Sequence, residues 1–138
     1  MNFNHKIIEV CVAQAKYLLE EFQEFYPFAF GIKKDLTVIP IMTFAGDEFP
    51  KPENIIIELE KLLIFSNNYN NFSAVAICSD VQYSNNSATT KSNALEIRAD
   101  FLNGPTINFY ELYALSDTSL FSLKGEVLEN GNLLFFNK

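Results

Sequence analysis

Residues 94–115 read ALEIRADFLNGPTINFYELYAL, and this stretch decides the fold. Apolar and polar residues alternate on both sides of Asn103-Gly104, a dipeptide that favours a two-residue turn between antiparallel strands. We therefore expect strands at 94–102 and 105–115, joined by a tight hairpin. A sheet built on this hairpin needs apolar cover on at least one face.

A two-residue turn fixes which side chains of the two strands share a face. Leu102 would lie opposite Pro105, and Arg98 would lie opposite Phe109. The face that carries Arg98 then mixes aliphatic, aromatic and charged side chains, as protein interfaces do. The predicted docking surface consists of Arg98, Ile107, Phe109, Glu111 and Tyr113. The alternative is that the C-terminal segment 120–136 folds over this face.

Two upstream segments have the apolar periodicity of amphipathic helices. The first runs from about Asn4 to Glu24, and the second begins near Pro52, continues for about three turns and ends in the polar run 66–71. Their apolar stripes are Ile8, Cys11, Ala15, Leu18, Phe22 and Phe25, and Ile55, Ile56, Leu59, Leu62, Leu63 and Phe65. We expect both helices on one side of the sheet.

Further strands are predicted between and after these helices. They are Tyr26–Lys33, Leu36–Phe44 and Phe72–Tyr83. Pro40 cannot donate to a strand ladder, so its strand should lie at a sheet edge. Ala29 and Gly31 make one face of the first strand small enough for a helix to approach closely. A second Asn-Gly pair, Asn130-Gly131, predicts a short C-terminal hairpin between 125–128 and 133–136.

The predicted order of elements is α-β-β-α-β-β-β, followed by one or two short strands. No linker or repeat divides the sequence, so we predict a single α+β domain, residues 1–138, with two main helices and an antiparallel sheet of five to seven strands. Over residues 1–115 this order resembles that of profilin-like proteins, including roadblock-type and longin-type modules. The resemblance implies a second strand at the edge and a final helix, where this sequence predicts a hairpin instead.

The stretch EFQEFYPFA at 21–29, with the loop Gly46-Asp47-Glu48, also resembles small bacterial proteins of uncharacterised function. That resemblance implies no particular activity.

The charge of the chain argues against two classes of partner. It has 10 Lys and Arg against 17 Asp and Glu, a formal net charge of -7. Such a chain repels phosphate backbones and anionic lipids, so we expect neither nucleic acid nor membrane as a partner. Without a leader pattern or a long apolar run, we expect a cytoplasmic protein.

Few residues suit catalysis or metal binding. His5 is the only histidine, and Cys11 and Cys78 have apolar neighbours typical of core thiols. One histidine and two distant cysteines do not provide a zinc site, and no phosphate-binding or nucleophile-elbow motif occurs. We expect no cofactor.

Three carboxylates are candidate functional groups. Asp47 and Glu48 lie in a loop before the second helix, and Asp80 lies late in a strand among apolar residues. The alternative for Asp47 and Glu48 is a solvated turn, and Asp80 would cap a turn at the sheet rim.

These observations support three functional hypotheses. The leading one is a non-enzymatic protein-interaction module, of the adaptor or immunity type, that binds a basic protein or a second copy of itself. The second is a sensor that binds a small molecule between helix and sheet. The third is an enzyme that depends on Asp80, or on Asp47 with Glu48.

Overall fold

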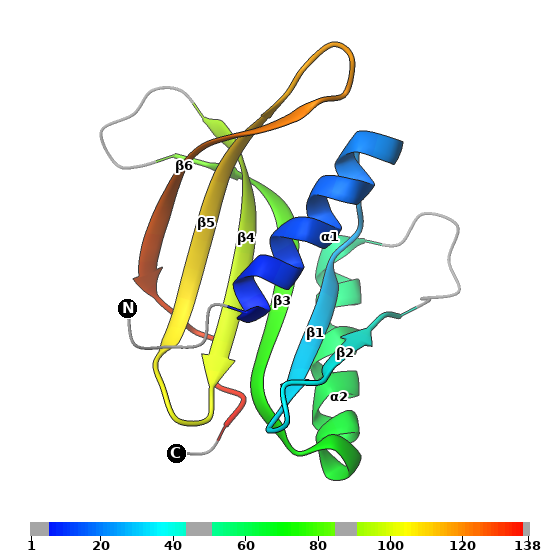
Figure 1. The fold of residues 1–138 in the computed structure, drawn as a ribbon, viewed down its shortest axis with the longest axis vertical. Coiled ribbons are helices and arrows are strands. Elements are labelled where there is room, and N and C mark those ends of the chain that lie inside the picture. The colour runs from blue at the N-terminus through cyan, green and yellow to red at the C-terminus, as the bar shows by residue number, and fades with distance from the viewer. Residues whose placement is uncertain (1–5, 44–50, 85–90, 137–138) are drawn as a thin grey trace.

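The computed structural model describes residues 6–43, 51–84 and 91–136, which form two helices and one six-stranded antiparallel sheet (Figure 1). The strand order is β2-β1-β3-β4-β5-β6. The elements are α1 (Lys6–Phe22), β1 (Phe28–Lys33), β2 (Val38–Ile41), α2 (Pro52–Asn70), β3 (Phe72–Tyr83), β4 (Ser92–Phe101), β5 (Thr106–Leu115) and β6 (Phe121–Asn130). The predicted α+β class, with two helices and an antiparallel sheet, is confirmed.

The two helices cover opposite faces of the sheet, with α1 in front and α2 behind in Figure 1. The prediction that both helices lie on one side is therefore wrong. β1 turns Phe28 and Phe30 toward the α1 core, while its neighbour Ala29 joins the core beneath α2. A strand that is apolar on both faces needs cover on both, so the molecule has three layers.

The buried stripe of α1 is rotated slightly from the predicted one. It consists of Ile7, Ile8, Cys11, Ala15 and Leu19. Leu18 is only partly buried and Phe22 is 63% exposed. The helix ends at Phe22 because Gln23 adopts a positive φ of 66°, and the Gln23 N–H donates to the Leu19 carbonyl at 2.8 Å.

The second helix is longer than predicted, since it continues through the polar run that was expected to end it. The Asn70 side chain donates to the Ser66 carbonyl at 3.1 Å and to the Ser66 hydroxyl at 2.7 Å, which satisfies polar groups of the last turn. Asn71 then ends α2 in the left-handed conformation. Only Ile55, Leu59 and Leu63 of the expected stripe are fully buried.

Two predictions concern the first strands: the edge position of the strand with Pro40, and close packing on the small face of β1. β2, with Pro40, lies at one edge of the sheet, as predicted. α2 packs on the small face of β1 at Ala29, as predicted, whereas Gly31 lies against the ring of Phe72 in β3. A Cβ atom at Gly31 would overlap that ring.

The register of β4 and β5 differs by one residue from the predicted register. Arg98 lies opposite Asn108, not Phe109, and Leu102–Pro105 forms the connection between the two strands. A two-residue turn would need the N–H of Pro105 to donate to Leu102, and proline has no N–H. The longer loop avoids that missing bond.

A one-residue shift moves every β5 side chain to the other face. The residues now beneath α1 are Ile107, Phe109, Glu111 and Tyr113. The residues on the face away from α1 are Thr106, Asn108, Tyr110 and Leu112.

The C-terminal hairpin does not form. Residues 121–130 instead make one long strand, β6, that pairs with β5. The Asn-Gly pair ends this strand, and the Gly131 N–H donates to the Thr106 carbonyl at 2.9 Å. A Cβ at Gly131 would collide with the backbone of Ile107, so glycine permits the close passage. Residues 131–136 then cross to the α2 face, where Leu133 is buried.

Asp100 attaches this C-terminal segment to the sheet. Its carboxylate is fully buried and accepts hydrogen bonds from the Thr106 hydroxyl at 2.6 Å, the Phe135 N–H at 3.0 Å and the Phe136 N–H at 2.8 Å. A buried carboxylate with several donors is strongly held by the fold.

We predict that Asp100→Ala lowers the free energy of unfolding by about 3 kcal/mol, because it leaves buried donors without an acceptor. Urea denaturation measures the change. Asp117→Ala, which removes an exposed carboxylate from the β5–β6 loop, is the control and should change stability by less than about 0.5 kcal/mol. Equal effects of the two substitutions would contradict the structural role of Asp100.

Candidate functional site

The five residues of the predicted docking surface do not share a face. Ile107, Phe109 and Tyr113 belong to the core beneath α1, and Glu111 lies with them at 7% exposure. Arg98 is on the opposite face. The prediction of a common exposed surface failed together with the register from which it was derived.

A different set of side chains occupies the uncovered face of β3 to β6. α2 lies behind the β1–β3 half of the sheet and leaves β5 and β6 open on that side (Figure 1). We call this surface the open face and define it by Tyr83, Glu96, Tyr110 and Glu129; Asn108 lies on the same side of the sheet but is buried. Sequence reasoning expected such a face on β4 and β5 but assigned the wrong β5 residues to it. Pro105 was the signal that could have corrected the register.

Two tyrosines and two glutamates on the open face are joined by hydrogen bonds. The Tyr110 hydroxyl donates to Glu96 Oε2 at 3.1 Å, and the Tyr83 hydroxyl donates to Glu129 Oε1 at 3.4 Å. The two rings lie with their centroids 4.8 Å apart. The contact is within the range of favourable aromatic pairs, so each ring restricts the other.

The electrostatics of the open face follow from burial and from these carboxylates. Burial and the nearby Glu96 raise the pKa of Tyr110 to about 12. The pKa of Tyr83 is also raised, by desolvation and by Glu129. Both phenols therefore remain neutral donors at physiological pH.

The cation beside the open face already has partners. Arg98 Nη1 lies 3.5 Å from Glu60 Oε1 of α2, and Arg98 Nε donates to Asn132 Oδ1 at 3.0 Å. These contacts hold the guanidinium toward α2 and the C-terminal segment. Glu96 and Glu129 make no ion pair within the portion of the chain that the structure describes.

A second feature, on the face covered by α1, is a groove of 460 Å³ between α1 and strands β5 and β6. We call it the acidic groove; its lining residues are Ile8, Glu9, Val12, Ala13, Phe109, Glu111, Leu123 and Glu126. Burial, and then the charge of Glu126, raise the pKa of Glu111. The groove combines apolar walls with three carboxylates.

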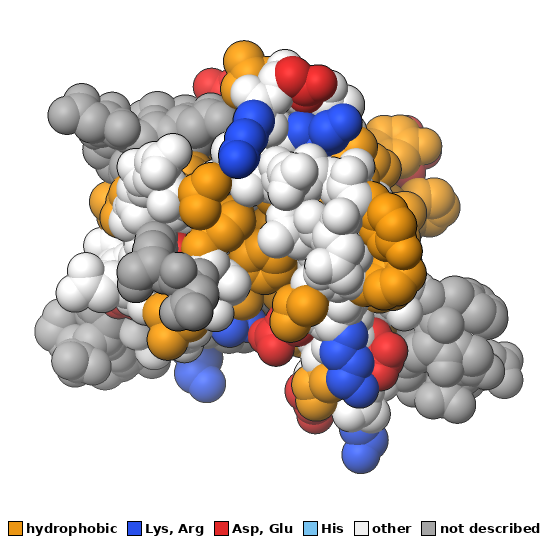
Figure 2. Space-filling view, turned by 90° about the horizontal axis from the view of Figure 1, so that it is seen from below, with side chains coloured by type: hydrophobic (Ala, Val, Ile, Leu, Met, Phe, Trp, Pro, Cys, Tyr) orange, Lys and Arg blue, Asp and Glu red, His pale blue; other side chains and the backbone are white. Residues whose placement is uncertain are grey.

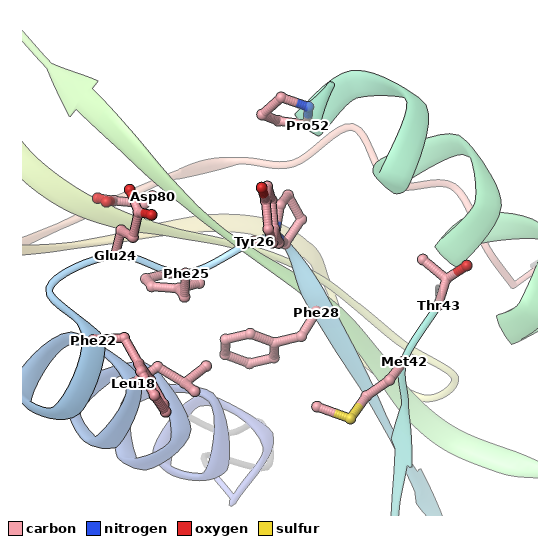
Figure 3. A pocket seen from close by; sticks show the side chains of 11 residues that line it. Leu18, Phe22, Glu24, Phe25, Tyr26, Phe28, Met42, Thr43, Pro52 and Asp80 are labelled. Atoms are coloured by element: carbon pink, nitrogen blue, oxygen red, sulfur yellow. The ribbon is translucent and has the colours of Figure 1, made fainter. Parts of the chain in front are cut away.

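An apolar pocket of 570 Å³ lies near the end of α1. Figure 3 shows the rings of Phe25 and Phe28 and the side chains of Leu18 and Met42 around it, with Asp80 to one side. Pro52, at the start of α2, lies across the pocket from α1. A volume in this range suits a small organic molecule.

Asp80 is the one predicted carboxylate whose surroundings the structure shows. It does not cap a turn, because β3 continues to Tyr83; it accepts a hydrogen bond from the Tyr113 hydroxyl at 2.7 Å. Partial burial raises the pKa of Asp80, and the bond from Tyr113 opposes that shift. Asp47 and Glu48 lie outside the described residues, as does His5.

The predicted core thiols are confirmed. Cys11 and Cys78 are both fully buried and are not joined in a disulfide. Burial raises the pKa of the Cys78 thiol, and the adjacent Cys11 contributes to the same shift. A thiol held neutral in this way is a poor nucleophile.

Exposed apolar side chains are spread over the surface. Figure 2, seen from the lower end of Figure 1, shows them among charged side chains of both signs. They occur on both helices, on β6 and on the C-terminal segment, and include Tyr17, Ile57, Ile64, Phe65, Leu128 and Leu134. Single exposed apolar residues are ordinary in proteins and define no site.

Comparisons with known protein families, with curated proteins and with solved structures found no match. In residues 6–43, 51–84 and 91–136, no helix is long and apolar enough to span a membrane. The same segments contain no group of three His, Cys, Asp or Glu side chains placed to hold a metal ion.

We predict that Glu96→Gln lowers the pKa of Tyr110 from about 12, because the substitution removes the negative charge that opposes the phenolate. Ultraviolet titration of wild type, Glu96→Gln and Tyr110→Phe identifies the relevant transition. In the unfolded chain the pKa of a tyrosine is about 10. Because the pKa of Tyr110 is higher in the folded protein, its neutral phenol favours the folded state at neutral pH, and this contribution to stability is lost as the pH rises through the folded pKa. An unchanged tyrosine titration in Glu96→Gln would contradict the coupling.

Proposed function

We propose that this chain is a non-enzymatic protein-interaction module that binds a basic protein through the open face. The observation that supports it is the pair of tyrosine–glutamate hydrogen bonds, which hold two rings and two carboxylates together on a sheet face that no helix covers. This arrangement provides aromatic contact area and negative charge in the same place.

The aromatic part of the open face suits binding because its side chains are already restrained. Tyrosine offers a large contact area with few rotatable bonds, and a hydrogen-bonded ring loses less freedom when a partner docks. Tyr83 and Tyr110 are each partly exposed, so their rings remain accessible. Tyrosines of this kind are common among the residues that dominate interface energies.

The charge of the open face selects the partner. Glu96 and Glu129 accept bonds from neutral phenols and make no ion pair among the side chains described. With a net charge of -7, the chain attracts a basic protein and accelerates its association. A second copy of this chain would place glutamates against glutamates, which disfavours self-association through this face.

We predict that Glu96→Lys with Glu129→Lys weakens binding of a fluorescent oligolysine peptide by at least about tenfold, because attraction becomes repulsion. Fluorescence anisotropy measures the affinity. Tyr110→Ala should also weaken binding, since the open face contributes aromatic contacts as well as charge.

The matched control is Glu21→Lys with Glu53→Lys, which makes the same change in net charge at exposed helix positions. If both double variants lose affinity equally, binding reflects diffuse charge and the open face has no special role. If Tyr110→Ala has no effect, the aromatic contribution is wrong.

A second candidate function is small-molecule binding in the apolar pocket. The specific observation in its favour is a cavity of 570 Å³ with several aromatic walls and a carboxylate at its margin. Such a composition is typical of ligand sites.

We predict that a pocket ligand at 100 times its dissociation constant adds about 2.7 kcal/mol to stability in a thermal-shift screen of apolar metabolites. Met42→Trp, at the pocket wall, should abolish the response by filling the cavity. Leu134→Trp, at a position 82% exposed, is the control and should preserve it. A hit that survives Met42→Trp binds elsewhere.

A further inference from the structure

The acidic groove contains a carboxylate, that of Glu111, for which the described residues provide no partner. Glu111 is 7% exposed, and no side chain or backbone group donates a hydrogen bond to it or forms an ion pair with it in the part of the chain described. Its cross-strand neighbours are Leu95 on β4 and Glu126 on β6, so one is apolar and the other has the same charge. The small exposed surface of Glu111 and the like charge of Glu126 both disfavour the ionised carboxylate, and a cation in the groove would offset both effects.

The position of Glu111 follows from the fold. Phe109 and Tyr113, two residues to either side, are buried in the core beneath α1, so the alternation of β5 turns the carboxylate to the same side. There it lines the groove rather than a closed interior. The carboxylate is therefore directed at a space that a ligand can enter.

The walls of the groove restrict the chemistry of that ligand. Ile8 and Val12 from α1 and Leu123 from β6 provide aliphatic surface, while the exposed Glu9 and Glu126 add negative charge from both sides. These carboxylates do not form a group placed to share one metal ion. Separated anions along an apolar groove match separated cations on a flexible aliphatic chain.

We propose that the acidic groove binds a linear aliphatic polyamine, with one ammonium group at Glu111 and others near Glu9 and Glu126. The methylene segments contact the aliphatic walls, and the ammonium groups supply the donors that Glu111 lacks. The site lies on the α1 face, so it is separate from the open face and does not depend on the proposed protein partner.

Isothermal titration calorimetry of the full chain with spermidine, a triamine, tests the proposal. We expect saturable binding with one molecule per chain and at least about tenfold weaker binding of butylamine, which has a single ammonium group. Equal affinity for butylamine would overturn the polyamine assignment and indicate a site for one ammonium group, such as a lysine side chain.

Glu111→Gln identifies the groove as the site. It keeps the shape of the side chain and should weaken spermidine binding by about tenfold or more, while the unliganded variant melts at the same or a higher temperature because an unpaired buried charge is removed. Glu129→Gln, with the same charge change on the opposite face, should bind spermidine like wild type. Loss of affinity in both variants, or in neither, would overturn the proposal.

Discussion

The register in which β4 pairs with β5 determines which side chains lie on each face of the sheet. Because Pro105 cannot close a two-residue turn, the connection lengthens and the strands pair one residue away from the register that Asn103-Gly104 suggests. This choice places Tyr110 on the open face and Glu111 beneath α1. Had the strands paired in the other register, the two residues would have exchanged environments, and both candidate sites would be lost.

The three-layer arrangement follows from the central strands. β1 and β3 are apolar on both faces, so one helix could not shield them, and α2 occupies the side opposite α1. The outer strands β5 and β6 present less apolar surface on the side of the sheet where α2 lies. Tyr83 and Tyr110 therefore remain accessible on one face of the sheet, while α1 spans toward β5 and β6 on the other and forms one wall of the acidic groove.

Sequence reasoning was successful where local pattern controls structure. It identified Phe72–Tyr83 as a strand with the observed bounds and placed Pro40 at an edge. It failed where distant contacts decide: Gly131 permits contact with Ile107 instead of forming a hairpin, and Asp80 pairs with Tyr113 instead of capping a turn. It named Glu111 but assigned it to a docking face, because one residue of register separates a surface position from a buried one.

Glu111 and Asp100 differ in what their carboxylates contact, and this difference distinguishes a carboxylate that stabilises the fold from one that is available to a ligand. Both carboxylates belong to the central hairpin, on residues with little exposed surface, yet Asp100 accepts hydrogen bonds from the Thr106 hydroxyl and from the Phe135 and Phe136 N–H groups, and the last two bonds hold the C-terminal segment. Glu111 accepts none from the residues described and faces a groove with two further carboxylates. The hydrogen bonds within the fold fully account for the buried carboxylate of Asp100. An apolar residue at position 111 would pack beside Phe109 without the electrostatic cost, and the proposed polyamine gives the charge at this position a role.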